Sequence, residues 1–311
     1  MEHTSKNVTD IIFFGTQTFA CQILQGLIDS PLFRVVLVIT QPDKPVGRKK
    51  ILSPTPVKIL AESLSIPVQT PGTLKTFHLD KNTAPLAIVA QYGKIIPQSV
   101  LDSFVKGVIN VHTSLLPKYR GASPIQSALM QGETETGVTI MKMDAGMDTG
   151  PLLSQKKLPI NPTDTYTELD KELGKIATPL LLETLERFLD NTISSLPQDE
   201  DHATYCKILS RDDGKIDWES MDKNTIFNLY RGLTPWPGVW TLLDSNRLKL
   251  HKMIPSSKEF PLGKLHFENG IFIGCKNGSL EILEIQLEGK PIMDAQTFMN
   301  GYQKHNDTKL I

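Results

Sequence analysis

Short, continuous apolar runs alternate with amphipathic segments through the first half of the chain. Residues 11–14 form an apolar run that ends at Gly15, which is typical of a strand in a sheet covered on both faces. Apolar residues at positions 19–28 then recur at helical spacing, and residues 35–39 read as a second buried strand. The alternation continues with predicted helices near 56–64 and 97–104 and predicted strands at 86–90 and 108–111. This order predicts an α/β fold built on a doubly wound, parallel sheet.

A long amphipathic segment and a polar stretch close this first part. Residues 165–189 predict a helix with a leucine-rich inner face, and we expect Pro179 to kink it. Residues 191–204 are polar and have no periodicity, which is typical of a linker. We therefore expect a first domain over residues 1–190, a linker over 191–204 and a second domain over 205–311.

The second domain contains short apolar runs separated by Gly, Asn, Asp and Ser turns. The expected strands are residues 239–242, 248–251, 264–267, 270–275 and 280–287. This spacing predicts a small antiparallel β-barrel, with one short helix in the tail over residues 294–311.

Composition and charge narrow the class of protein. A chain of 311 residues with 40% hydrophobic and 22% charged residues is typical of a globular protein with two domains. The three cysteines form no CxxC pair, which favours a reducing, cytoplasmic setting without a zinc site. We expect neither a signal peptide nor a membrane span, because no apolar run approaches ~18 residues. The net charge of -1 means that a polyanionic partner would be held by local patches.

The first candidate site residues are Asn110 and His112, at the carboxyl end of the predicted strand 108–111. Ligands bind at such strand ends in open α/β sheets. Residues two apart in an extended segment project to the same side, so the amide and the imidazole can face one crevice. A histidine alone is more often structural, but the neighbouring motif Ser114-Leu115-Leu116-Pro117 favours a functional interpretation.

A second candidate is the loop over residues 144–150, which contains Asp144 and Asp148. It follows a predicted strand over residues 137–143, and its glycines allow sharp turns and a close approach of the backbone to a ligand. Taken alone, the loop is equally typical of a plain acidic turn or a calcium-binding loop, although the EF-hand spacing is not met.

Together these motifs resemble the shared core of the 10-formyltetrahydrofolate-dependent formyltransferases: Asn-x-His, Ser-Leu-Leu-Pro, and an Asp thirty-six residues after the His. The resemblance implies a Rossmann-like catalytic domain, 10-formyltetrahydrofolate as co-substrate and no metal. It implies catalytic roles for Asn110, His112 and Asp148. It also implies that the folate carrier is bound by Gln91, Tyr92, Gly93, Ile95, Ser114, Leu115, Leu116, Pro117 and Asp144.

Further motifs resemble the methionyl-tRNA branch of that family more than its purine-pathway branch. These are residues 120–125, Arg-Gly-Ala-Ser-Pro-Ile, the early loop 40–48, and the segments 215–218 and 235–238. The resemblance implies an initiator methionyl-tRNA partner, a carboxyl-terminal OB-like barrel that binds tRNA, and a chain that acts as a monomer. It places Arg48, Lys49 and Lys50 at the tRNA acceptor end, although the lysines are shifted by one residue from the expected pattern.

The chemistry of formyl transfer explains these residue types. A neutral amine attacks the formyl carbon, and negative charge develops on the former carbonyl oxygen. The amide NH2 of Asn110 and a protonated His112 are suitable donors to that oxygen. Asp148 can orient His112 and accept the proton of the amine, directly or through water.

Three alternatives remain at this level. A nicotinamide-dependent oxidoreductase is disfavoured, because residues 15–20 contain one glycine where the dinucleotide fingerprint needs three. A formyltransferase acting on a sugar nucleotide or a ribonucleotide amine would use the same three residues with another acceptor pocket. A tRNA-binding module with an inactive catalytic half would also contain them.

Overall fold

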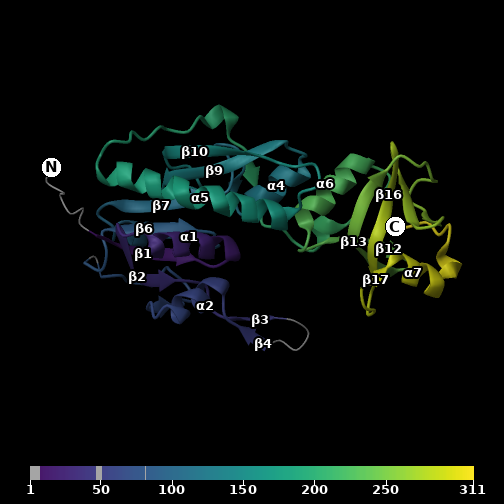
Figure 1. The fold of residues 1–311 in the computed structure, drawn as a ribbon, viewed down its shortest axis with the longest axis horizontal. Helices are drawn as coiled ribbons and strands as arrows, with labels where there is room; N and C mark the ends of the chain where they lie inside the picture. The colour runs from purple at the N-terminus through teal and green to yellow at the C-terminus, as the bar shows by residue number, and fades with distance from the viewer. Residues whose placement is uncertain (1–7, 47–50, 81) are drawn as a thin grey trace. The chain divides into compact units, whose positions relative to one another are not determined.

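The computed structural model describes residues 8–46, 51–80 and 82–311, and the chain divides into two compact units (Figure 1). The first unit contains the residues up to 124 together with 135–159 and 170–206. The second contains 125–134, 160–169 and 207–311. The domain limits drawn from the sequence, 1–190, 191–204 and 205–311, stay a prediction.

A seven-stranded sheet forms the centre of the first unit. Its order is β10-β9-β7-β6-β1-β2-β5. The strands are β1 (Thr9–Gly15), β2 (Phe33–Ile39), β5 (Val68–Gln69), β6 (Leu86–Ala90), β7 (Gly107–His112), β9 (Glu135–Lys142) and β10 (Leu152–Pro159). The five strands from β5 to β7 are parallel, which confirms the Rossmann-like α/β prediction for this part of the sheet.

The other edge of this sheet is antiparallel, which corrects the expectation of a wholly parallel sheet. Strand β9 runs antiparallel to β7, and β10 runs antiparallel to β9. A loop over residues 143–151 joins β9 to β10, and such a connection is too short for the crossover helix that parallel neighbours require. Strand β10 was not predicted, because its sequence is largely polar and most of its side chains are exposed or half-buried.

Helices α1 (Thr18–Asp29), α2 (Pro56–Ser63) and α3 (Gln98–Leu101) follow strands of the parallel part, as the sequence predicts. The long helix α5 (Tyr166–Leu189) packs against α1 (Figure 1). A Cβ atom at Gly26 of α1 would lie 2.0 Å from Thr178 Cγ2 of α5, so glycine permits this close contact. The unit also contains a small hairpin of β3 (Lys44–Val46) and β4 (Ile51–Ser53), and a parallel pair of β8 (Arg120–Gly121) and β11 (Tyr205–Cys206).

The parallel strands are almost entirely buried. Every residue of β6 is buried, and so are Ile11 to Gly15 of β1. One core cluster joins apolar side chains of β1, β2 and β6 to those of residues 92–104, including Tyr92, Ile96, Val100 and Phe104. This core fixes the strand ends at which the candidate side chains lie.

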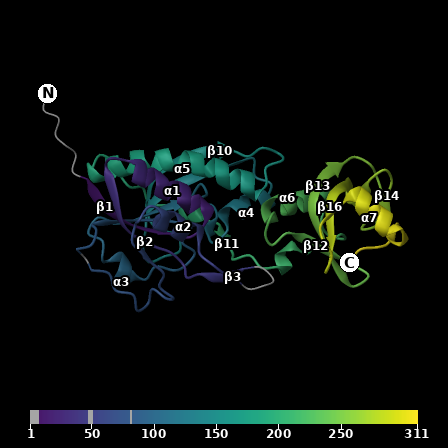
Figure 2. The same ribbon diagram turned by 60° about the horizontal axis from the view of Figure 1, so that its bottom comes forward.

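The second unit contains an antiparallel sheet of six strands. They are β12 (Val239–Leu243), β13 (Asn246–Ser256), β14 (Leu265–Phe267), β15 (Ile271–Cys275), β16 (Gly278–Leu287) and β17 (Met293–Asp294), in the order β12-β13-β16-β15-β14 with β17 beside β16. The predicted strands are confirmed, with longer limits for β13. Figure 2 shows α7 (Ala295–Gly301), the short helix expected in the tail, alongside this sheet.

Two helices of the second unit were not predicted. Helix α6 (Lys223–Leu233) begins at Asp222, whose side chain accepts the N–H of Thr225, and buries Ile226 and Leu233 against the sheet core. Helix α4 (Pro124–Met130) lies mostly within the range 125–134. Helix α4 is short, with few apolar positions to mark the helical period, whereas α6 has Ile226, Leu229, Tyr230 and Leu233 at helical spacing, a signal that could have found it.

Candidate active site

The carboxyl ends of β6 and β7 position the candidate residues. Strand β1 pairs with β2 on one side and with β6 on the other, so the chain reverses its direction of winding between β1 and β6. Ligands bind beside such switch points in open α/β sheets. The parallel register places Val89 of β6 beside Asn110 of β7, and the loop over residues 91–97 follows directly.

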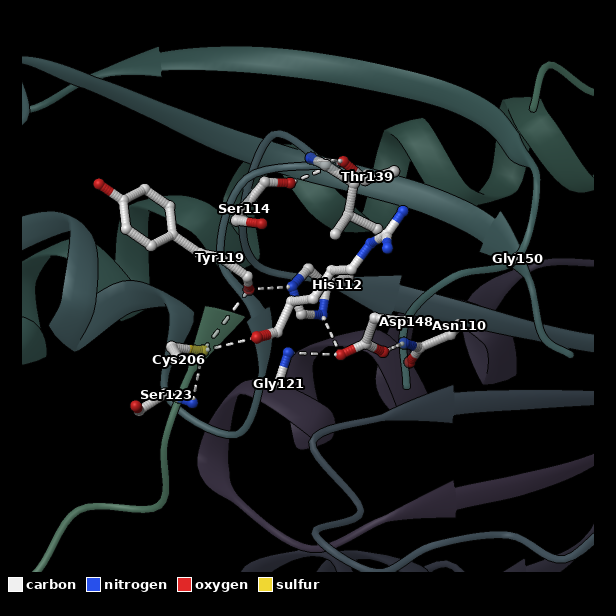
Figure 3. Close-up of polar contacts among 12 residues, drawn as sticks. Asn110, His112, Ser114, Tyr119, Gly121, Ser123, Thr139, Asp148, Gly150 and Cys206 are labelled. Carbon is white, nitrogen blue, oxygen red and sulfur yellow. Dashed lines mark hydrogen bonds and ion pairs between the residues drawn. The ribbon is translucent and has the colours of Figure 1, made fainter. Parts of the chain in front are cut away.

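Three side chains converge beyond these strand ends, as Figure 3 shows. Asn110 Nδ2 lies 3.4 Å from Asp148 Oδ1, and His112 Nδ1 lies 3.7 Å from Asp148 Oδ2. The N–H of Gly121 donates to Asp148 Oδ2 at 2.8 Å. The carboxylate therefore contacts the amide, the imidazole and a main-chain N–H at the same time.

The ring of His112 is held from both sides. Its Nε2 lies 3.0 Å from the main-chain carbonyl oxygen of Tyr119, and the side chain is only 6% exposed. A carbonyl oxygen only accepts, so Nε2 carries the hydrogen in this contact. The carboxylate of Asp148 lies on the other side of the ring, near Nδ1.

Asp148 and Gly121 both adopt left-handed backbone conformations. Asp148 has φ +55°, a conformation that costs a non-glycine residue roughly 1–2 kcal/mol. Gly121 has φ +117°, and a Cβ atom there would lie 2.3 Å from the carbonyl oxygen of Cys206. Only glycine fits this position, and its N–H reaches the Asp148 carboxylate as a result.

The loop of Ser114 to Pro117 is fixed by polar contacts. Ser114 is fully buried, and its hydroxyl donates to the carbonyl of Lys118 at 2.6 Å. The hydroxyl of Thr139 donates to the carbonyl of Ser114 at 2.6 Å and accepts the N–H of Leu116 at 3.1 Å. Leu116 is buried, whereas Leu115 and Pro117 are half-buried. Of the four, Leu115 and Pro117 have the side chains that remain partly accessible.

The side chains of the loop after β6 differ in burial and in hydrogen bonding. Tyr92 is 2% exposed and packs edge-on against Phe14 with 5.5 Å between ring centroids, so its ring belongs to the core. Burial raises the pKa of Tyr92 to about 12. The carbonyl of Tyr92 accepts from Thr16 Oγ1 at 2.9 Å and from Gln41 Nε2 at 2.7 Å. The ring of Tyr92 and this carbonyl are therefore engaged within the protein.

Other residues of this loop have exposed side chains or contain a polar atom without a hydrogen-bond partner in the part of the chain that the structure describes. Gln91 has φ +42°, and its Nε2 donates to Asp170 Oδ1 at 3.1 Å. The Oε1 atom of Gln91 is buried, with no hydrogen-bond partner among the described residues. Gly93 has φ +74°, and Ile95 is 91% exposed.

Asp144 lies on the surface and stabilises its own loop. Its Oδ1 accepts the N–H of Gly146 at 3.0 Å and the hydroxyl of Thr149 at 2.7 Å. These contacts hold the turn that leads into Asp148. The structure therefore gives Asp144 a role in the shape of the loop beside its expected place near the carrier.

The predicted tRNA contacts Arg48, Lys49 and Lys50 lie outside the described residues. Across residues 8–46, 51–80 and 82–311, no group of three or more His, Cys, Asp and Glu side chains is placed to hold a metal ion. Within the same ranges, no helix combines the length and the apolarity that crossing a membrane requires.

Sequence reasoning missed three contributors to this site: the N–H of Gly121, the carbonyl of Tyr119 and the hydroxyl of Thr139. The motif Arg-Gly at residues 120–121 did carry a signal for the first, since a glycine after a strand end often marks a close backbone contact. Thr139 acts across 25 residues of sequence, and the carbonyl of Tyr119, seven residues after His112, is a main-chain group that no side-chain pattern shows.

Comparison with known proteins adds two family matches. The model described as Formyl transferase matches residues 9–185, and the model described as Formyl transferase, C-terminal domain matches residues 208–303. A methionyl-tRNA formyltransferase of Caldicellulosiruptor saccharolyticus is 42% identical over 305 residues, which cover 94% of this chain and 97% of the relative. A methionyl-tRNA formyltransferase of Listeria monocytogenes serotype 4a is 42% identical, with 94% and 96% covered.

Solved structures with the same fold include the sugar 3N-formyl transferase WlaRD, with a TM-score of 0.67, 21% identity and coverage of 92% of this chain and 100% of that one. HypX from Aquifex aeolicus in complex with tetrahydrofolic acid has a TM-score of 0.66 and 17% identity, with 96% and 48% covered. These identities are low, so the two structures support the fold alone.

Proposed function

The chain belongs to the formyl transferase family, and from this premise we propose that it transfers the formyl group of 10-formyltetrahydrofolate to the free amino group of methionyl-tRNA. The product is N-formylmethionyl-tRNA, which serves translation initiation. The observation that carries this conclusion is the identity of 42% to methionyl-tRNA formyltransferases along almost the whole of both chains.

We propose that Asn110, His112 and Asp148 carry out the transfer. The amide NH2 of Asn110 donates to the oxygen on which negative charge develops, and a protonated His112 does so by sharing the Nε2–H that also bonds the Tyr119 carbonyl. Loss of one such donor costs roughly 10²–10³ in rate. Asp148 holds His112 in orientation and takes the proton of the attacking amine, directly or through water. The tetrahedral centre then collapses, the bond from its carbon to the carrier nitrogen breaks, and that nitrogen takes up the proton to leave as tetrahydrofolate. Their convergence within 3.4 Å and 3.7 Å of one carboxylate supports this division of roles.

We further propose that the folate carrier lies against the loops that follow β6 and β7. The buried Oε1 of Gln91 lacks a donor, and a bound ring with N–H groups would supply one. Its amide orientation is set by the bond from Nε2 to Asp170, so the oxygen is the atom left over. Ile95 and the half-buried Leu115 and Pro117 supply apolar surface.

The second unit is proposed to be an OB-like half-barrel that binds tRNA, and Arg48, Lys49 and Lys50 are proposed to bind its acceptor end. The antiparallel order of the six strands is compatible with such a barrel. We propose that the chain acts as a monomer in the cytoplasm and prefers the initiator tRNA. Sedimentation analysis at working concentration tests the monomer directly, since a dimer would double the expected mass.

A comparison of acceptors tests the function. The protein is given labelled 10-formyltetrahydrofolate together with methionyl initiator tRNA, glycinamide ribonucleotide or an amino-sugar nucleotide. Label should appear on the methionine amino group at a rate far above that for the two small acceptors. Faster transfer to either small acceptor would assign the chain to another branch of the family.

A further inference from the structure

A polar segment over residues 196–206, here named the bracing segment, lies along the first unit. The sequence predicts most of it to be a linker, yet it is bound at both ends. Leu196 forms a β-bridge with Leu152, and the carbonyl of Thr204 accepts the N–H of Arg120 at 2.8 Å. Strand β11 then pairs with β8, which contains Gly121. The bracing segment is therefore part of the structure around the candidate active site.

Within the bracing segment, Gln198 reaches the loop of Asp148. Its Nε2 donates to the main-chain carbonyls of Asp148 and Gly150, both at 2.8 Å. Its Oε1 accepts from Nε and Nη2 of Arg120 at 3.1 Å and 2.9 Å. A reversed amide would place oxygen against two carbonyl oxygens and NH2 against a guanidinium, so one orientation alone is possible.

Arg120 fixes this glutamine in turn. The arginine is fully buried, and its remaining N–H groups bond Glu200 at 2.7 Å and 2.8 Å and the hydroxyl of Tyr205 at 3.1 Å. All five of its donors therefore have acceptors. The hydrogen bonds that Arg120 donates to Glu200 raise the pKa of Arg120 and lower the pKa of the glutamate. A guanidinium and a carboxylate that are joined by two hydrogen bonds have a defined relative geometry. Because Gln198 bonds the same guanidinium, its amide is held in a defined position as well.

The two carbonyls held by Gln198 flank Thr149 and include that of Asp148 itself. Asp148 keeps a left-handed conformation, with φ +55°, that an unrestrained aspartate would leave. We propose that Gln198 is a positioning residue, whose amide, fixed by Arg120 and Glu200, holds the Asp148 main chain so that its carboxylate faces His112 and Gly121. This inference rests on the proposed function, in which Asp148 acts on His112 and on the amine.

The first test replaces Gln198 with methionine, which keeps the length of the side chain and removes all four hydrogen bonds. A displacement of about 1 Å in a reacting group costs on the order of 10²-fold in rate, so kcat for methionyl-tRNA formylation should fall by a factor approaching that value. KM for both substrates should stay nearly unchanged, because the four bonds of Gln198 go to Arg120 and to the main chain of Asp148 and Gly150. Gln25→Met, whose glutamine bonds Asp29 at the surface of α1, is the matched control and should leave kcat unaltered.

A double-mutant cycle separates positioning from general stability. If Gln198 acts through Asp148, then Gln198→Met should add no further loss of kcat in an Asp148→Ala background. Effects that multiply in the double variant would overturn the proposal. Glu200→Gln is a milder second variant, since its side chain is 66% exposed, and it should reduce kcat less, with the same non-additivity.

Hydrogen exchange provides a measurement that does not depend on activity. The N–H of Gly121 is bonded to Asp148 Oδ2, so release of the Asp148 loop should speed its exchange in Gln198→Met. Unchanged exchange at Gly121 would refute the positioning role even if the protein transferred no formyl group. Absence of formyl transfer by the wild-type protein would refute the proposed function alone.

Discussion

At the scale of single residues, Asp148 is the centre of the candidate site. One of its oxygens lies near the amide of Asn110, and the other lies between His112 and the N–H of Gly121. The left-handed backbone of Asp148 is uncommon for a residue other than glycine, and such conformations persist where the surrounding structure enforces them. The conformation is therefore consistent with a loop that is held in place by its neighbours, as proposed for Gln198.

Asn110→Ala should lower kcat by roughly 10²–10³, because it removes a donor to the developing oxyanion. KM for methionyl-tRNA should change little, since the amide acts on the transferred group. Steady-state kinetics with both substrates varied gives these values, and circular dichroism checks that the fold is retained. A normal kcat would exclude Asn110 from the transfer step.

Gly121→Ala should impair both stability and activity. The added Cβ would lie 2.3 Å from the carbonyl of Cys206 at a φ of +117°, so the β8–β11 pair must shift and the N–H must leave Asp148. We expect a loss of at least about 2 kcal/mol in the free energy of unfolding. Urea denaturation measures it, with Gly72→Ala as control, because a Cβ at Gly72 meets nothing within 4 Å. Equal urea midpoints of unfolding for Gly121→Ala and Gly72→Ala would contradict the predicted steric clash at Gly121.

At the scale of elements, the sequence predicts the buried strands of the first unit well, because continuous apolar runs leave few alternatives. Strand β10 escaped prediction, since its pairing is set by tertiary contacts that local periodicity does not record. Helix α6 was also missed, although its apolar side chains recur at helical spacing. The residues of the candidate site also divide into those that local sequence predicts and those that only the tertiary structure brings in. Asn110, His112 and Asp148 could be predicted from motifs, whereas Gln198 lies in a segment whose polar composition suggested a linker.

The cap of α6 gives a pH-dependent prediction. The pKa of Asp222 lies below its ordinary value, mainly because the backbone N–H of Thr225 donates to its carboxylate. The ionised Asp222 carboxylate therefore contributes fully to the free energy of unfolding above the unfolded pKa of about 3.9. This stabilisation is lost as the pH falls through the lower folded pKa. Asp222→Ala should cost about 1 kcal/mol at pH 7.

Chemical denaturation of the wild-type protein and of Asp222→Ala over a pH series checks this cap. The difference in unfolding free energy should remain constant from pH 7 to about pH 5 and then shrink toward zero in more acidic solution. The exposed Asp212→Ala is the control and should differ little from wild type at every pH. A difference that grew on acidification would have the wrong sign for a capping carboxylate.

At the scale of the whole molecule, charge offers no general attraction for RNA. The chain has a net charge of -1, and residues 205–311 contain 14 Lys and Arg against 13 Asp and Glu. Recognition of tRNA must therefore depend on cations gathered locally, each of which releases counterions when it binds a phosphate.

This dependence predicts different salt responses for the two substrates. KM for methionyl-tRNA should rise by about tenfold or more between low and physiological salt, whereas KM for 10-formyltetrahydrofolate should rise much less. Initial rates measured over a salt series give both values. Replacing Arg48, Lys49 and Lys50 together with alanine should flatten the tRNA response, and an unchanged slope would remove these residues from the tRNA contact.

One cluster of amide, imidazole and carboxylate is proposed to perform the transfer to methionyl-tRNA. Single-turnover formylation of initiator methionyl-tRNA, with both substrates saturating, isolates this step. His112→Ala and Asp148→Ala should each slow it by orders of magnitude while the variants remain folded. A wild-type rate in either folded variant would contradict the proposal.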